Sequence, residues 1–146
     1  MDNSGHATSK VFGSELLLDL YDCKAGACDD LTLCYKFLDE IVGYLGMEKQ
    51  SPPSIFRSDE VRFPDKAGLS GWVPLIESSI VIHTLTPKNF ISIDIFCCRP
   101  FDIKKAEEFC SAFFAPKKIE TQFIERGKSY YADETAPAVK KEFAHR

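Results

Sequence analysis

The sequence predicts an α+β fold, a two-layer sandwich in which two helices lie on one face of a mostly antiparallel sheet. Two segments carry apolar residues at helical spacing, and about six shorter segments are rich in Val, Ile, Leu and Phe. Short turns join most strand segments, which favours antiparallel pairing, because parallel strands need long crossovers. The 146 residues are enough for one domain with one core.

The N-terminal part of the domain is expected to form a strand and then a helix. The run ELLLDLYD at residues 15–22 predicts the strand. Asp29 and Asp30 are suitable N-caps for the helix, Gly46 is suited to end it, and the proline pair at 52–53 prevents its continuation. The apolar residues of this helix recur at helical spacing: Leu31, Cys34, Tyr35, Leu38, Ile41, Val42 and Leu45.

The middle of the chain predicts an extended segment, a loop and three strands. Residues 55–63 are expected to be extended and residues 64–68 to form the loop. Three segments rich in Val, Ile and Phe then predict strands at 71–77, 79–84 and 90–98. Pro74 lies within the first of these strands and predicts a sheet edge or a bulge there.

The C-terminal part is expected to add a second helix and a last strand. Asp102 is the expected cap of the helix, which stops before Pro116. Its inward side chains are expected to be Ile103, Ala106, Phe109, Cys110 and Phe113. Residues 118–126 alternate apolar and polar side chains and predict the strand.

The composition excludes several classes of protein. The chain is 45% hydrophobic and 27% charged, with a net charge of −4, so we expect a globular protein without a nucleic-acid partner. It has no apolar stretch of membrane-spanning length and no signal-peptide core, which predicts a cytoplasmic protein without a membrane partner. Polar, aperiodic residues at 1–12 and 132–146 predict tails around a single domain at 13–131.

The cysteines are not expected to form disulfides or to bind a metal. A reducing compartment keeps thiols free, and small buried thiols fill a core well. The chain has no C-x-x-C motif and only His83 lies outside the tails, so we expect no metal site. The six cysteines are Cys23, Cys28, Cys34, Cys97, Cys98 and Cys110.

The stretch with the most chemical information lies between Ser70 and Cys98. Residues 70–84 read SGWVPLIESSIVIHT, and residues 93–98 read IDIFCC. This pattern resembles the prokaryotic S-adenosylmethionine decarboxylase family, which has a Ser-Gly pair, a short hydrophobic strand, Glu-Ser, Ile-His-Thr and a later Asp-hydrophobic-Phe-x-Cys segment. All these elements fall at the family's spacing without a gap, and fainter agreement covers most of residues 13–126.

The resemblance implies a self-processing, pyruvoyl-dependent decarboxylase whose chain is cut between Glu77 and Ser78. In such an enzyme the serine hydroxyl attacks the preceding carbonyl, and the amide becomes an ester. Elimination then yields a dehydroalanine, and hydrolysis leaves a pyruvoyl group, the covalent cofactor, at the new chain start. Its ketone forms a Schiff base with the substrate amine and accepts the electrons left by carbon dioxide. Ser79 could react similarly, but only Ser78 has the family's spacing to Ser70 and His83.

The resemblance also implies roles for four other side chains. His83 would take the serine α-proton during processing, because imidazole titrates near neutral pH. Ser70 would hold the oxygen of the ester intermediate. Cys98 would return a proton to the substrate carbon, because a thiol with an ordinary pKa of about 8.5 stays protonated at neutral pH. Phe63 would stack on a flat group of the substrate, although a role as a hydrophobic loop anchor explains it equally well.

Each of these residues also has an ordinary explanation. Glu-Ser pairs are common, a histidine in a β-rich run is usually a core residue, and Cys97 and Cys98 alone would count as core filler. Their joint spacing is what carries the hypothesis. Ser78 and His83 have opposite parity on a straight strand, so they are expected to converge only if the chain bends near the cleavage point.

The resemblance weakens after Thr84. The family usually continues with Trp-Pro-Glu, whereas this chain has Leu85, Thr86 and Pro87, followed by Lys88. The missing carboxylate is the one expected to bind the nucleoside hydroxyls. The self-processing residues are therefore complete, but the substrate-recognition pattern is not.

Three functions are compatible with this pattern. The first is decarboxylation of S-adenosylmethionine, which supplies aminopropyl groups for the biosynthesis of spermidine and other polyamines. The second is the same chemistry on ornithine or arginine, and the third is an unprocessed, non-catalytic relative that binds a ligand or partner. The complete processing set disfavours the third. The resemblance also implies a homodimer of processed protomers with active sites near the subunit boundary.

Overall fold

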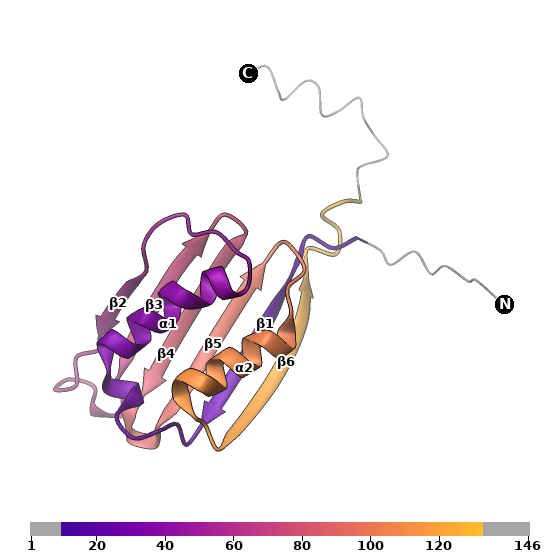
Figure 1. Ribbon diagram of the computed structural model, residues 1–146. Helices are drawn as coiled ribbons and strands as arrows, with labels where there is room; N and C mark the ends of the chain where they lie inside the picture. Colours follow the sequence, from indigo (N-terminus) through magenta and orange to yellow (C-terminus); the bar gives the residue numbers. More distant parts are fainter. Residues whose placement is uncertain (1–9, 133–146) are drawn as a thin grey trace.

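The predicted α+β sandwich is confirmed. The computed structural model describes residues 10–132, and its centre is one sheet of six antiparallel strands in the order β2-β3-β4-β5-β1-β6. Both α-helices lie on the same face of this sheet (Figure 1). The strands are β1 (Gly13–Tyr21), β2 (Ser54–Arg57), β3 (Leu69–Leu75), β4 (Ser78–Leu85), β5 (Phe90–Cys97) and β6 (Lys118–Arg126). The helices are α1 (Leu31–Tyr44) and α2 (Ile103–Phe114), with short 3-10 turns η1 (Ala27–Asp29), η2 (Pro64–Lys66) and η3 (Thr86–Lys88).

Each α-helix begins at the aspartate that the sequence predicts as its cap. The side chain of Asp30 accepts a hydrogen bond from the N–H of Leu33 at 3.0 Å. Asp102 accepts one from the N–H of Lys105 at 3.1 Å. Each cap satisfies a backbone donor that the helix itself leaves unpaired, a contribution of about 1 kcal/mol.

The core lies between the helices and one face of the sheet. Alternate residues of β1, β4 and β5 point into it and are fully buried, including Leu18, Ile82 and Ile93. On the helix side, the rings of Phe37 and Phe114 pack with their centroids 4.9 Å apart. The alternate side chains of the same strands point to the opposite face of the sheet, which neither helix covers (Figure 1).

The predicted extended segment at 55–63 is wrong beyond Arg57, where β2 ends. The chain turns instead, because the Asp59 side chain accepts hydrogen bonds from the N–H groups of Val61 and Arg62, both at 3.1 Å. An aspartate that caps its own following backbone offers an alternative to strand pairing, and this local effect decides the conformation here.

Pro74 lies where β3 has lost its partner strand, as the sequence predicts. β2 pairs with β3 only from Leu69 to Trp72, so no regular strand lies beside Pro74 on that side. The missing N–H of the proline therefore leaves no ladder hydrogen bond unmade.

The predicted tails, residues 1–12 and 132–146, lie mostly outside the described residues. Within the described part of the chain, no helix is long and apolar enough to cross a membrane. The cytoplasmic location and the lack of a nucleic-acid partner stay predictions.

Candidate active site

The proposed cleavage point lies at a tight turn between β3 and β4. Leu75 pairs with Ser78, so Ile76 and Glu77 alone form the turn. Ser78, the first residue of β4, has a φ of 149°. Residues other than glycine rarely adopt such a positive φ, and holding one there costs about 1–3 kcal/mol. The backbone is therefore strained at the serine that the sequence singles out.

The carbonyl of Glu77, which Ser78 would attack, is held by the end of β5. The backbone N–H of Cys98 donates a hydrogen bond to this oxygen at 2.9 Å. A donor in this position polarises the carbonyl and stabilises negative charge that develops on its oxygen during attack. The hydrogen bond also keeps Cys98 close to the bond that would be cut.

The side chain of Glu77 is almost fully buried, with 5% of its surface exposed. One carboxylate oxygen accepts a hydrogen bond from the N–H of Glu48 at 3.1 Å, and the other pairs with the guanidinium of Arg99. Burial alone would raise the pKa of Glu77, but the Glu48 N–H, its own N–H and the Arg99 guanidinium together hold that pKa below its ordinary value.

Cys97 is the last residue of β5, and Cys98 follows it outside the strand. Cys97 is buried in the core, and this burial raises the pKa of its thiol. Cys98 is partly exposed. The thiol predicted to donate a proton is thus the accessible one of the pair.

Ser70 and His83 form a second group of predicted site residues. They are cross-strand partners on β3 and β4, and Ser70 Oγ lies 3.0 Å from His83 Nδ1. Both are exposed on the face of the sheet that the helices do not cover. Gly71 explains this placement: a Cβ on it would lie 2.7 Å from Leu38 of α1, so the Ser-Gly pair lets the helix approach while the serine points away.

Asp94 lies beside this group and was not predicted as a site residue. It faces the same side of the sheet, opposite Val81, two residues from His83. Burial raises the pKa of Asp94, as does the negative charge of Glu15, while the charge of His83 acts in the opposite direction. A carboxylate there can stabilise the protonated imidazole. The sequence feature that could have identified Asp94 is its place in the IDIFCC motif.

Within one chain, the residues at the cleavage point lie apart from Ser70 and His83. His83 is five positions after Ser78 along β4, which is roughly 16 Å at about 3.3 Å per residue. The strand alternates regularly between them, with Ile80 and Ile82 buried towards the helices and His83 on the other side. Glu77, Ser78 and Cys98 therefore meet at one end of the strand, and Ser70 and His83 lie apart from them.

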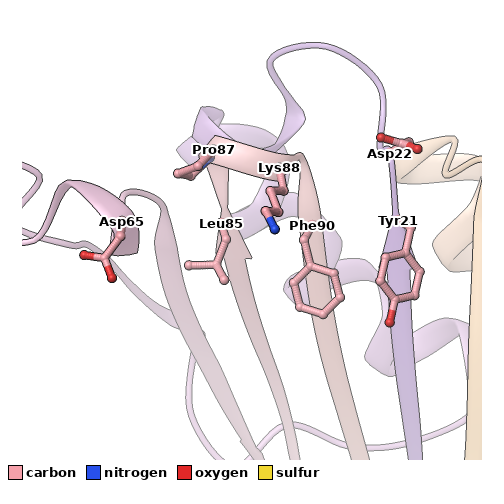
Figure 2. A pocket seen from close by; sticks show the side chains of 7 residues that line it. All are labelled: Tyr21, Asp22, Asp65, Leu85, Pro87, Lys88 and Phe90. Carbon is pink, nitrogen blue, oxygen red and sulfur yellow. The ribbon is translucent and has the colours of Figure 1, made fainter.

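The residues that depart from the family pattern line a pocket of about 660 Å³ at the other end of β4 (Figure 2). Its lining residues are Tyr21, Asp22, Asp65, Leu85, Pro87, Lys88 and Phe90. Figure 2 shows the Lys88 ammonium extending between Leu85 and Phe90, and the carboxylate of Asp65 pointing away from Leu85. The wall is mainly apolar, and its charged residues are one cation, Lys88, and two carboxylates, Asp22 and Asp65.

Phe63, the predicted stacking residue, is half-exposed and is not part of this lining. The guanidinium of Arg62 lies over its ring, 5.1 Å from the centroid. Its role in substrate binding stays a prediction.

Comparison with known proteins identifies the family of this chain. The family model described as S-adenosylmethionine decarboxylase matches residues 14–127. The S-adenosylmethionine decarboxylase proenzyme of Persephonella marina is 31% identical over 119 residues, which cover 81% of this chain and 84% of that protein. That of Aquifex aeolicus is 30% identical over 120 residues, covering 82% and 84%.

A solved structure has the same fold. The crystal structure of the adenosylmethionine decarboxylase from Aquifex aeolicus superimposes with a TM-score of 0.67 at 27% identity, covering 81% of this chain and 92% of that one. Members of the matched family depend on a pyruvoyl group formed from a serine by self-cleavage. The chain belongs to the S-adenosylmethionine decarboxylase family.

Proposed function

We propose that this chain is the proenzyme of a pyruvoyl-dependent S-adenosylmethionine decarboxylase, and that Ser78 is the residue that becomes its cofactor. The observation that carries the assignment to Ser78 is the strained turn, in which Ser78 has a φ of 149° and the preceding carbonyl accepts the Cys98 N–H. Rearrangement of the Glu77–Ser78 peptide into an ester would release this strain. The product would supply aminopropyl groups for polyamine biosynthesis.

Processing requires three chemical steps at the turn. The Ser78 hydroxyl adds to the Glu77 carbonyl, the C–N bond breaks, and Ser78 keeps a free amine and an ester on its oxygen. Loss of the Ser78 α-proton to a base then expels the Glu77 carboxylate and leaves a dehydroalanine. Water finally replaces the nitrogen, which leaves as ammonia. The pyruvoyl group then supplies a ketone that accepts the electrons of the departing carboxylate.

The base that removes the Ser78 α-proton would come from a second copy of the chain. His83 is the predicted base, but it lies roughly 16 Å from Ser78 on the same strand and on the other side of the sheet. Two-fold pairing of the uncovered sheet faces would bring Ser70 and His83 of the partner subunit to the β3–β4 turn. There the φ of 149° takes Ser78 out of the regular alternation of β4, which would let its reacting atoms turn towards the uncovered face. We therefore propose a homodimer in which each active site combines residues of both subunits.

In such a dimer, the pocket of Leu85, Pro87 and Lys88 would face the same composite site, because it continues β4 just beyond His83. It would then receive the part of the substrate that is distant from the reacting amine. The inward Lys88 ammonium repels a second cation by about 2–3 kcal/mol at roughly 6 Å and an effective dielectric constant of about 20. Ornithine and arginine carry such a cation at the far end of the side chain. The sulfonium cation of S-adenosylmethionine lies between its amino acid part and its nucleoside, so the end that would enter this pocket is uncharged.

We expect the processed protein to release carbon dioxide from carboxyl-labelled S-adenosylmethionine and not from ornithine or arginine. The Lys88 charge should favour the nucleoside substrate by roughly tenfold or more. Lys88→Gln should narrow this preference and leave cleavage unchanged. Release from an amino acid alone would refute the substrate assignment, while the pyruvoyl chemistry would stand. Release from none of the three would mean that the substrate is another compound.

Cys98→Ala is expected to separate processing from turnover. The variant should still cut itself, because the hydrogen bond to Glu77 comes from the backbone N–H of residue 98 and not from its thiol. Decarboxylation should fall by about 10²–10⁴-fold, because proton return to the substrate loses its donor. Cleavage on a denaturing gel and carbon dioxide release measure the two steps.

The neighbouring thiol provides the control. Cys97→Ala removes a thiol that points into the core, so it should keep both activities in whatever fraction folds. A folded Cys98→Ala variant that failed to cut itself would contradict the role assigned to Cys98.

A further inference from the structure

We infer that Arg99 is a positioning residue for self-cleavage, which neutralises the Glu77 side chain so that a second carboxylate can form on the same residue. The inference rests on the proposed function, since it concerns the rate at which the Glu77–Ser78 bond is cut.

The contact is built into the turn. Two consecutive residues contact Glu77. The N–H of Cys98 donates a hydrogen bond to its backbone carbonyl, and the guanidinium of Arg99 pairs with its side-chain carboxylate. The Arg99 guanidinium also lies 3.4 Å from the Gly46 carbonyl, to which it donates a hydrogen bond. Among the described residues, Arg99 is the one cation paired with the Glu77 carboxylate. Nearby Lys49 is paired with Asp39 instead.

The chemistry of the elimination step explains why this charge matters. When the Ser78 ester breaks, the leaving group is the main-chain carboxylate of Glu77. Glu77 then carries two negative charges a few bonds apart in a site that excludes most water, where like charges repel strongly. A guanidinium already paired with the side chain compensates one of these charges before the second develops.

A purely structural role explains the contact less well. The Arg99 side chain is 60% exposed, so water screens the pair and it contributes less to the stability of the fold than a fully buried pair would. The Glu77 carboxylate, in contrast, is buried at the scissile bond, where an uncompensated charge would be costly. The benefit of the pair is therefore expected in the cleavage rate.

The test follows self-cleavage over time on denaturing gels, with chains made in a cell-free translation reaction. Arg99→Gln should cut itself at least tenfold more slowly than the wild type, and Arg99→Lys should be intermediate. Once fully processed, Arg99→Gln should decarboxylate within about twofold of the wild type per pyruvoyl group. Lys49→Gln is the matched control, because it removes an ion pair next to the same turn but leaves Glu77 held. It should cleave at the wild-type rate.

A double variant separates charge neutralisation from simple disruption. If the uncompensated Glu77 charge slows cleavage, adding Glu77→Gln to the Arg99→Gln variant should raise its cleavage rate at least threefold. A role limited to tethering the turn to Gly46 predicts that the double variant is no faster than Arg99→Gln. Melting temperatures of the same substitutions in the uncut Ser78→Ala background separate a lower cleavage rate from a lower folded fraction. Wild-type speed in Arg99→Gln, or no gain in the double variant, would overturn the inference while the proposed function stands. A wild-type chain that never cuts itself would overturn both.

Discussion

Ser78→Ala is expected to leave the chain uncut and without decarboxylase activity. The methyl group has no nucleophile to attack the Glu77 carbonyl, so neither the ester nor the pyruvoyl group can form. The loss of activity should be complete within detection, because no other residue can supply the ketone. Mass spectrometry should find a single 16.4 kDa chain for the variant. The wild type should give a fragment that ends at Glu77 and another that resists Edman sequencing.

The neighbouring serine gives the matched control. Ser79→Ala removes a hydroxyl one residue further along β4, and this hydroxyl is not next to the carbonyl that Cys98 holds. Cleavage and activity should both stay close to the wild-type level. Cleavage that persisted in Ser78→Ala, or that disappeared in Ser79→Ala, would move the cofactor to a different residue.

Local signals were enough to predict most of the fold. The boundaries of both α-helices follow from caps that act within three residues, as with Asp30 and Asp102. β6 was predicted with the bounds that it has, because its alternation is visible in the sequence alone. The segment after Arg57 was mispredicted because a single side chain, Asp59, outweighs the strand propensity of its neighbours.

The candidate site was predictable in its members but not in its geometry. The spacing of the motif identified Ser70, Ser78, His83 and Cys98, and the parity of β4 already placed Ser78 and His83 on opposite faces. The φ of Ser78 and the Cys98–Glu77 hydrogen bond depend on how β5 meets the turn, which no local pattern encodes. The pairing of Arg99 with Glu77 was missed for the same reason, since 22 residues separate them.

Ser78 and His83 lie far apart on β4, and this separation predicts a large effect of mixing two inactive variants in the proposed dimer. Ser78→Ala alone lacks the nucleophile, and His83→Ala alone lacks the base, so neither chain should mature when it is made by itself. In a mixed dimer, the His83→Ala chain keeps Ser78 and Cys98, and the other chain contributes Ser70 and His83. One of the two composite sites is then complete, while the other lacks both groups.

Co-expression of the two variants in equal amounts should therefore restore about a quarter of the wild-type activity. Random pairing makes half of the dimers mixed, and each mixed dimer has one working site of two. The cut fragments should come from the His83→Ala chain alone, which a mass tag on one chain would reveal. Pairing Ser78→Ala with Cys98→Ala is the control: the nucleophile and the proton donor lie at the same end of one chain, so decarboxylation should stay low even though the Cys98→Ala chain is cut. If co-expression of Ser78→Ala and His83→Ala left every chain intact, His83 would have to act within its own subunit, and β4 would have to bend during processing to bring it to Ser78.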